Sequence, residues 1–422
     1  MLVKTRKAVS TAVAAILVIV LIVLGGAVYY FYYYTNPASS GPKGTIGVVF
    51  DVGGKGDLGF NDLAFLGASQ AANELGYNVT WLQSPTQNDY TPNLEKLAKL
   101  SPAPALIVGV GALMSFAVNQ TAHEFPNQKF AIVDGFLPAL PNMMVLNFKE
   151  NEGSAVVGAL AAFVADCYSK QGKGNFEVGM VLGIPIPVLY HFEIGYKWGV
   201  SWAQNYSQTI NSPILQGKSV KDVVLYTYTN SFTDQTLGKQ TALAQFQQGA
   251  VVSFNVAGAT GLGIFSAAQE QGAGQSMGPP FGIGVDSDQD WIAPGFILTS
   301  MEKRVDVSVH AAAQMATNGS WSSFISGPSG GYLVPGIKDG GIKMADVADI
   351  TQFLQIAVQN GKNINQTDIT NKINAMRSSV TQACGPVYDY ASHLSDLIKS
   401  GQVSVPLVST NDALAYWRSR YG

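Results

Sequence analysis

The sequence predicts an α/β protein with two doubly wound lobes joined by a hinge and an N-terminal membrane helix. In residues 45–76 an apolar, β-branched run, a glycine-rich turn and a helical pattern follow one another. Strand and helix patterns then alternate with short connections to about residue 150, which favours a parallel sheet with helices on both faces. Near residue 150 the pattern restarts. Two such units in succession indicate two lobes that face each other across a cleft.

The opening stretch places the first candidate ligand residues. Residues 45–50 read as a buried strand, and a helical pattern runs from Phe60 until Gly76 stops it. Ligands of doubly wound domains bind at the carboxyl ends of the strands. Asp51, Phe60 and Asn61 stand at this end, so we expect them to line a binding site.

The glycine-rich turn contains Gly54, Gly56 and Gly59 at the spacing of a dinucleotide fingerprint. That motif alone is weak. An aromatic ring and an amide at the helix start do not suit a pyrophosphate, so we expect no cofactor.

The remaining elements divide the chain. Further strands are predicted at 79–83, 105–110, 129–133, 143–148, 178–182, 223–228, 251–256 and 281–285. Short strands at 296–300 and 331–335 are expected to cross back between the lobes and form the hinge. The predicted domains are 1–35 (export signal and membrane anchor), 36–44 (linker), 45–150 with about 301–335 (lobe 1), 151–300 (lobe 2) and 336–422 (C-terminal crossover and helical extension).

The N-terminus reads as a membrane anchor. Lys4, Arg6 and Lys7 precede an uncharged run over residues 8–34, which exceeds the roughly 20 residues that a spanning helix needs. Positive charge before the run places the N-terminus in the cytoplasm and the body outside. Residues 7–11 resemble archaeal pilin-like (class III) signals, whose cleavage would leave the apolar helix in place. No cysteine lies nearby, which excludes a lipid-modified one.

Composition excludes several classes of function. The net charge of −3 gives no electrostatic footprint for nucleic acid. His123, His191, His310 and His393 show no metal-ligand spacing, and we find no Cys-x-x-Cys, nucleophile elbow or phosphate-binding loop. His191 has no evident acid partner. We therefore expect neither a metal nor a catalytic site.

The only cysteines are Cys167 and Cys384. An external compartment permits a disulfide between them, and two separate thiols are the alternative.

From about residue 45 to 345, ordered motifs resemble the basic membrane protein (BMP) family of substrate-binding proteins of ABC importers, typified by purine-nucleoside receptors. The matching stretches include Asp51-x-Gly53-Gly54 with Phe60-Asn61, Asp89-Tyr90-x-Pro92-Asn93-Leu94, Phe130-Ala131-Ile132-Val133-Asp134, Phe192-x-x-Gly195-Tyr196, Ser231-Phe232-Thr233-Asp234, Gly258-Ala259-Thr260-Gly261, Gly284-Val285-Asp286-Ser287-Asp288 and Lys303-Arg304-Val305. The resemblance implies two Rossmann-like lobes in a type I periplasmic-binding-protein fold.

The resemblance also implies a ligand set. Aromatic rings matching Phe60 and Phe232 would sandwich a base, and stacking is worth about 1–3 kcal/mol per base. Asp286 and Lys303 would hold the ribose hydroxyls. Gly258 would allow close backbone approach, and Asp51 and Asn61 would complete the polar rim.

Other interpretations stay open at this stage. Read alone, Phe60 and Phe232 also suit core aromatics, Lys303 a solvated helix start and Asp134 a structural cap. Relatives often carry an aromatic after the glycine that matches Gly111 and an acid a few residues on. Here both are lost, with Phe116 near the acid's place, which leaves the purine preference open.

The sequence thus predicts a monomeric extracytoplasmic receptor, anchored in the cell membrane, that captures a nucleoside, with a purine expected, and delivers it to an ABC permease. A nucleoside-processing or NAD-linked enzyme and a binding protein for another small solute are the alternatives.

Overall fold

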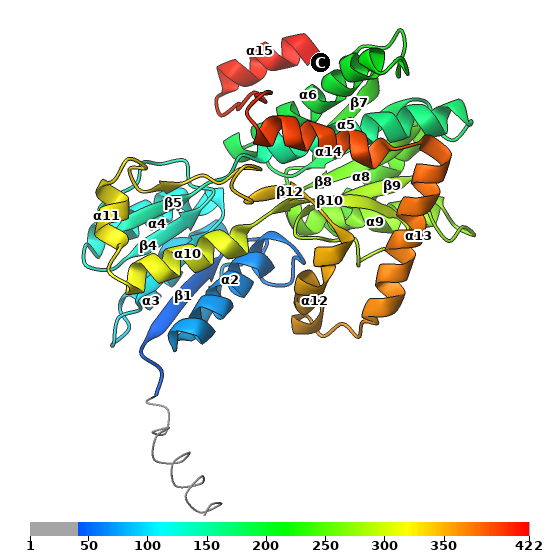
Figure 1. The fold of residues 1–422 in the computed structure, drawn as a ribbon. Coiled ribbons are helices and arrows are strands. Elements are labelled where there is room, and N and C mark those ends of the chain that lie inside the picture. Colours follow the sequence, from blue (N-terminus) through cyan, green and yellow to red (C-terminus); the bar gives the residue numbers. More distant parts are fainter. Residues whose placement is uncertain (1–40, 422) are drawn as a thin grey trace, which may run out of the picture. The chain divides into compact units, whose positions relative to one another are not determined.

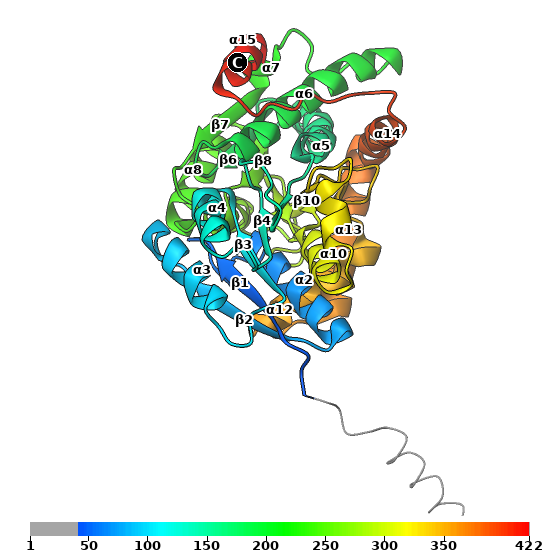
Figure 2. The same ribbon diagram turned by 90° about the vertical axis from the view of Figure 1, so that its left-hand side faces the viewer.

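The computed structural model describes residues 41–421, so the predicted membrane anchor at 1–35 lies outside the described residues. From Gly44 onward the chain forms one compact unit. It contains two six-stranded sheets, each with helices on both faces (Figures 1 and 2). The two-lobed α/β architecture predicted from the sequence is confirmed. Within 41–421, every helix is too short or too polar to cross a bilayer.

The first lobe is built on the sheet order β11-β5-β4-β3-β1-β2. All neighbouring strands in it pair in parallel. Its elements are β1 (Thr45–Phe50), α2 (Phe60–Leu75), β2 (Asn78–Gln83), α3 (Tyr90–Ala98), β3 (Leu106–Val110), α4 (Ser115–Glu124), β4 (Phe130–Val133), β5 (Met143–Leu146), α10 (Val305–Thr317), α11 (Trp321–Ser326) and β11 (Tyr332–Leu333).

Alternation along the strands explains why helices cover both faces of this sheet. Ile46, Val48 and Phe50 of β1 pack in one core with α2 and α10, whereas Val49 packs in a second core with α3 and α4. Successive side chains of a strand point to opposite faces, so an uninterrupted apolar strand must be buried on both sides.

The second lobe repeats the design with the order β12-β10-β9-β8-β6-β7, in which only the β10–β12 pair is antiparallel. Helices α5 and α6 cover one face, and α8 and α9 the other. Its elements are α5 (Glu150–Lys170), β6 (Glu177–Leu182), α6 (Pro187–Thr209), α7 (Val220–Val223), β7 (Val224–Tyr228), α8 (Gln235–Gln248), β8 (Ala250–Val256), α9 (Leu262–Gln271), β9 (Phe281–Asp286), β10 (Ile297–Lys303) and β12 (Ile342–Met344).

The chain passes between the sheets at three places: between β5 and α5, between β10 and α10, and between β11 and β12. A C-terminal extension then packs mainly on the second lobe. It consists of α12 (Ile350–Gln359), α13 (Gln366–Cys384), α14 (Val387–Lys399) and α15 (Asn411–Tyr421). A disulfide between Cys167 and Cys384 ties α13 to α5.

Both sheets share one topological feature that positions the site. The chain runs from β1 outward to β2 and then back past β1 to β3, and it runs from β6 to β7 and back to β8 in the same way. The strand order therefore reverses at β1 and at β6. Crevices form outside the carboxyl ends of the strands at such reversals, and ligands of open α/β sheets bind there.

Candidate ligand-binding site

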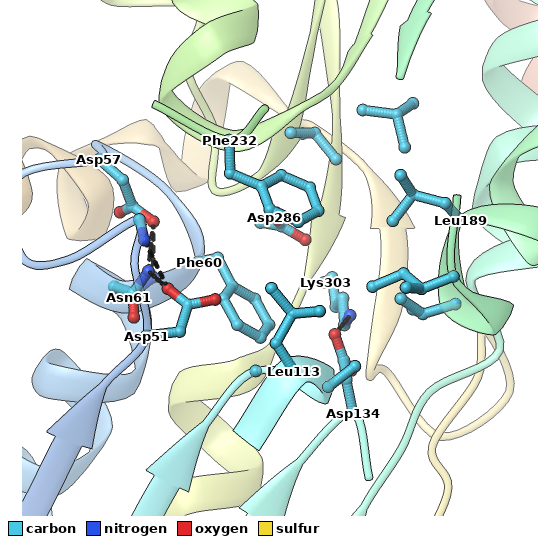
Figure 3. Close-up of a pocket in the computed structure, with 18 of the residues that line it drawn as sticks. Asp51, Asp57, Phe60, Asn61, Leu113, Asp134, Leu189, Phe232, Asp286 and Lys303 are labelled. Atoms are coloured by element: carbon cyan, nitrogen blue, oxygen red, sulfur yellow. Dashed lines mark hydrogen bonds and ion pairs between the residues drawn. The ribbon is translucent and has the colours of Figure 1, made fainter. Parts of the chain in front are cut away.

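A cavity lies between the carboxyl ends of the two sheets (Figure 3). It holds about 620 Å³ of empty space, part of it open to solvent. Both lobes supply its walls. All of the ligand residues expected from the sequence line it: Asp51, Phe60, Asn61, Phe232, Gly258, Asp286 and Lys303.

Each lobe contributes an aromatic ring to the cavity. Phe60 opens α2 of the first lobe, and Phe232 stands in the loop between β7 and α8 of the second (Figure 3). Gly183 makes room for the Phe232 ring, because a Cβ there would stand 2.1 Å from it. Gly258 has a φ of 54°, a backbone conformation that favours glycine. Close packing therefore requires a glycine at 183, and the backbone conformation favours one at 258.

The remaining walls are mainly apolar. They come from the segments that follow β3 and β6 and from α6: Ala112, Leu113, Ile186, Val188, Leu189 and Phe192. Phe116 does not belong to this wall, since it is 67 % exposed and packs edge-on against Phe136. Leu113 rather than Phe116 therefore faces the cavity in this segment.

Polar side chains gather at two separate places in the cavity (Figure 3). The first, which we call the turn end, consists of Asp51, Asp57 and Asn61. The Asn61 amide nitrogen donates to Asp51 Oδ1 and to Asp57 Oδ2, both at 3.0 Å. Because both amide hydrogens are used, the orientation of the amide group is fixed. Its buried Oδ1 has no hydrogen-bond partner within residues 41–421.

Burial shapes the acidity of the turn end. Burial raises the pKa of Asp51, against hydrogen bonds from Asn61 and from the backbone of Gly53 and Gly54. Burial, reinforced by the nearby Asp62 carboxylate, raises the pKa of Asp57 to about 7. Burial thus disfavours the ionised form of both carboxyl groups, although the hydrogen bonds that they accept favour it.

The amide groups of the glycine-rich turn bind carboxylates of the protein itself. The backbone N–H groups of Gly56 and Leu58 donate to Asp62, and that of Gly59 donates to Asp57. A pyrophosphate would need such amides and would meet these acids instead. The fingerprint spacing thus serves the shape of the turn.

The same turn touches the second lobe. The carbonyl oxygen of Leu58 accepts from Ser287 Oγ at 2.7 Å and from Gln289 Nε2 at 3.2 Å. These bonds cross from the turn after β1 to the segment after β9 and lie beside the cavity-lining Asp286. The lobes are held together next to the site.

The second polar group, which we call the cluster end, consists of Asp134, Asp286 and Lys303, which line the cavity, and Glu150, which contacts Lys303 without lining it. Lys303 Nζ lies 2.7 Å from Asp134 Oδ2 and 3.0 Å from Glu150 Oε1. The Lys303 and Glu150 side chains are both only 1 % exposed. The ring centres of Phe60 and Phe148 lie 5.1 Å from the ammonium, within cation–π range. Carboxylates and aromatic faces thus surround this cation.

Asp286 and Lys303 were expected to hold the ribose hydroxyls together, and the structure gives Lys303 other direct partners. Between residues 41 and 421, Asp286 makes no ion pair within 4 Å, and its Oδ1 is buried without a hydrogen bond. Burial raises its pKa to about 7, against the attraction of Lys303 and with the repulsion of Asp134 and Glu150. A residue that lines the cavity thus holds a buried oxygen without a protein partner.

At the other charged groups of the cluster end, burial and the neighbouring opposite charges shift the pKa in opposite directions. Burial raises the pKa of Asp134 to about 6, although Lys303 opposes the shift. Burial would also raise the pKa of Glu150, but Lys303 and His191 outweigh it and lower that pKa. Burial would lower the pKa of Lys303, but the surrounding carboxylates raise it. A charged lysine with two direct carboxylate partners results.

Sequence reasoning missed several of these residues. Asp134 was also consistent with a structural cap. It follows β4 as Asp51 follows β1, and this position at the carboxyl end of a strand was the signal that could have identified it. Asp57 lies in the glycine-rich turn, but it was not predicted as a ligand residue. No local pattern pointed to Glu150. It is the acid partner that the sequence did not reveal for His191: His191 Nδ1 lies 2.9 Å from Glu150 Oε2.

Among the described residues, no histidine, cysteine and carboxylate group has a geometry that could hold a metal ion.

Comparison with known proteins identifies the class to which this fold and cavity belong. Residues 45–380 match the family model described as ABC transporter substrate-binding protein PnrA-like. The chain belongs to this family. It is therefore a substrate-binding protein of the ABC transporter type, whose partners are a small-molecule ligand and a transporter.

Individual relatives agree. An uncharacterized lipoprotein of Pyrococcus horikoshii is 34 % identical over 87 % of this chain and 85 % of its own length. An ABC transporter nucleoside-binding protein of Lactococcus lactis is 27 % identical over 75 % of this chain and 85 % of its own. The crystal structure of an ABC transporter solute-binding protein from Aeropyrum pernix superposes with a TM-score of 0.77 at 31 % identity, covering 89 % of this chain and 98 % of that one.

Proposed function

We propose that the protein binds a nucleoside, with a purine preferred, between its two lobes and delivers it to an ABC importer. The observation that carries the proposal is the pairing of an aromatic slot with open acceptors at both ends. Asn61 Oδ1 at the turn end and Asp134 Oδ1 and Asp286 Oδ1 at the cluster end are buried without partners within residues 41–421. Buried polar atoms are rarely left unpaired, so a ligand with donors at both ends fits.

A nucleoside has this distribution of groups. Its flat base suits the rings of Phe60 and Phe232, and base N–H groups suit the acceptors of the turn end. Its vicinal hydroxyls donate to carboxylates such as Asp286 at the cluster end. The relative from Lactococcus lactis that is named as nucleoside-binding supports this choice.

Phosphorylated ligands fit poorly. Asp51, Asp134 and Asp286 line the cavity, and the positive charge of Lys303 is already shared by two carboxylates. A phosphate placed among these acids would be repelled, since like charges at close range cost free energy. We therefore expect nucleosides to bind and nucleotides to be rejected.

The proposal includes the location of the protein and its movement. Residues 1–35 would anchor it with the binding unit outside the cell. The relatives named as lipoproteins support a location at the membrane, whereas the means of attachment would differ here, because residues 1–35 contain no cysteine. Residues 45–150 with about 301–335 would move against 151–300 about the three chain crossings. When the lobes close around the ligand, the protein adopts a conformation that differs from that of the ligand-free protein, and the transporter can distinguish the two.

Calorimetry on residues 44–422 with a panel of nucleosides, free bases, sugars and nucleotides tests this function. We expect binding of at least one nucleoside, weaker binding of its free base and no binding of ribose or of the 5′-monophosphate. Binding of sugars without any nucleoside would reject this ligand class. Mass spectrometry of ligand retained through purification provides an independent identification.

A further inference from the structure

Glu150 uses both of its carboxylate oxygens, and only one of them serves the cavity. Oε1 lies 3.0 Å from the Lys303 ammonium at the cavity wall. Oε2 lies 2.9 Å from Nδ1 of His191, on the far side of the carboxylate. The Glu150 side chain is 1 % exposed and that of His191 15 %. The carboxylate is therefore held between a cation that faces the ligand and a ring that does not line the cavity.

The hydrogen bonds of His191 fix the arrangement of its protons. A carboxylate only accepts hydrogen bonds, so Nδ1 must carry the hydrogen that it donates to Glu150. The other ring nitrogen, Nε2, lies 2.8 Å from Ser409 Oγ and in the neutral ring accepts from that hydroxyl. The chain of contacts thus runs from Lys303 through Glu150 and His191 to Ser409.

The segment that carries Ser409 is itself firmly attached to the second lobe. Val405 accepts a hydrogen bond from the Asn151 side chain, next to Glu150 in α5. Beyond Ser409, Arg418 of α15 binds both carboxylate oxygens of the buried Glu193 in α6, at 2.9 and 2.7 Å. Ser409 is therefore a fixed point from which the ring of His191 can be oriented.

We propose that His191 is a positioning residue of the binding site, which holds Glu150 so that the other carboxylate oxygen fixes the Lys303 ammonium against the cavity wall and Asp134. Neither His191 nor Ser409 lines the cavity. Without His191, Glu150 Oε2 would lose its partner. The Glu150 carboxylate could then rotate and offer this oxygen to Lys303, and the ammonium group would shift with it. The proposal rests on the proposed function only for the choice of ligand.

The test is a double-mutant cycle with guanosine as the calorimetric probe. His191→Phe keeps a ring of similar size and removes both nitrogens. We expect it to weaken guanosine binding about three- to thirtyfold, which lies within the range for residues coupled in one network. In the Lys303→Met background the same change should have no further effect. His191→Gln, which keeps a donor for Glu150, should recover part of the affinity.

A merely structural role predicts a different result. His191→Phe would then weaken binding by the same factor in both backgrounds, and that result would overturn the proposal, as would an unchanged affinity in the wild-type background. His310→Phe is the matched control, because His310 also pairs with a carboxylate, that of Glu74. Like His191 it does not line the cavity, and its partner is not an ion-pair partner of Lys303. It should leave guanosine binding unchanged.

Urea unfolding of the ligand-free protein separates this inference from the proposed function. If the wild type binds no nucleoside, the proposed function fails, and the inference is decided by the same cycle of His191→Phe and Lys303→Met. If Glu150 couples the two residues, His191→Phe should shift the urea midpoint by different amounts in the wild type and in Lys303→Met. Equal shifts would overturn the inference.

Discussion

The turn end and the cluster end of the cavity reach a similar chemistry by different routes. Asp51, Asp57 and Asn61 come from one segment of eleven residues, and their hydrogen bonds are almost all to that segment. The cluster end is assembled from β4, α5, β9 and β10, and its ion pairs join residues far apart in the chain. The first is a preformed local turn, and the second depends on how the lobes meet.

This difference has an energetic consequence. The turn end is held by hydrogen bonds from an amide group and backbone N–H groups to the carboxyl groups of Asp51 and Asp57. Each contributes about 0.5–1.5 kcal/mol net, or about 1.5–3 kcal/mol where the carboxylate is ionised. The cluster end buries several charges, whose desolvation is offset only while every partner is present. Damage to the turn end should mainly alter binding, whereas damage to the cluster end should alter both binding and folding.

The largest effect is expected for Lys303→Met, which leaves Asp134 and Glu150 buried without their cation. Removing one partner of a buried pair costs about 3–5 kcal/mol. We expect a loss of that size in the free energy of unfolding in urea. Lys239→Met is the control, because its partner Glu270 is 52 % exposed, and exposed pairs contribute about 0–1 kcal/mol. Equal losses for the two variants would refute the distinction.

The next effect is expected for Asp286→Ala at the same end. It removes the open acceptor for the ribose hydroxyls and leaves the ion pairs of Lys303 with Asp134 and Glu150 in place. We expect nucleoside binding to weaken by about 2–4 kcal/mol in calorimetry, as for truncation of one partner of a buried charged contact. A change below about 0.5 kcal/mol would remove Asp286 from the ribose site.

Phe232→Ala should act on both ends alike, because the ring lies on the wall between them. Stacking is tolerant of the base, so nucleoside and free base should both weaken by about 1–3 kcal/mol. Calorimetry with the two ligands checks this. A loss confined to the nucleoside would contradict a stacking role and would place the ring at the ribose.

The pH dependence should come from Asp286 at the cluster end. The pKa of Asp57 is also raised to about 7, but both of its oxygens already accept hydrogen bonds from the protein, so a ligand depends less on its ionisation. The ligand-free protein holds Asp286 with a pKa of about 7, and the ionised form is the better acceptor for hydroxyl groups. Binding therefore requires loss of a proton, so affinity rises with pH and reaches a plateau above 7. One unit below that pKa the affinity should be about tenfold lower. Asp286→Asn should flatten the profile between pH 5.5 and 8, and an unchanged profile would assign the titration to another group.

The sequence was sufficient for the parts of the molecule in which the determining contacts are local. The apolar strand at 45–50, the turn and the helix at Phe60 follow one another in the chain, so Asp51, Phe60 and Asn61 could be placed at a carboxyl edge. The family motifs supplied the cavity positions of Phe232, Gly258, Asp286 and Lys303. All of these positions line one cavity.

The rest depended on distant contacts. Lys303 and Asp134 are 169 residues apart, and the two cysteines of the disulfide are 217 apart. No local pattern specifies which of several acids a buried lysine will meet, because the arrangement of the lobes decides it. For the same reason Glu150 could not be named as the partner of His191.

The central claim is that the two polar ends recognise different parts of one ligand. The ratio of guanosine affinity to guanine affinity, measured by calorimetry in Asp286→Ala and in Asn61→Leu, tests it most directly. We expect Asp286→Ala to lower this ratio, since it should weaken binding of the nucleoside far more than binding of the base. Asn61→Leu should weaken both ligands and leave the ratio near its wild-type value. The same change of the ratio in both variants would contradict the account.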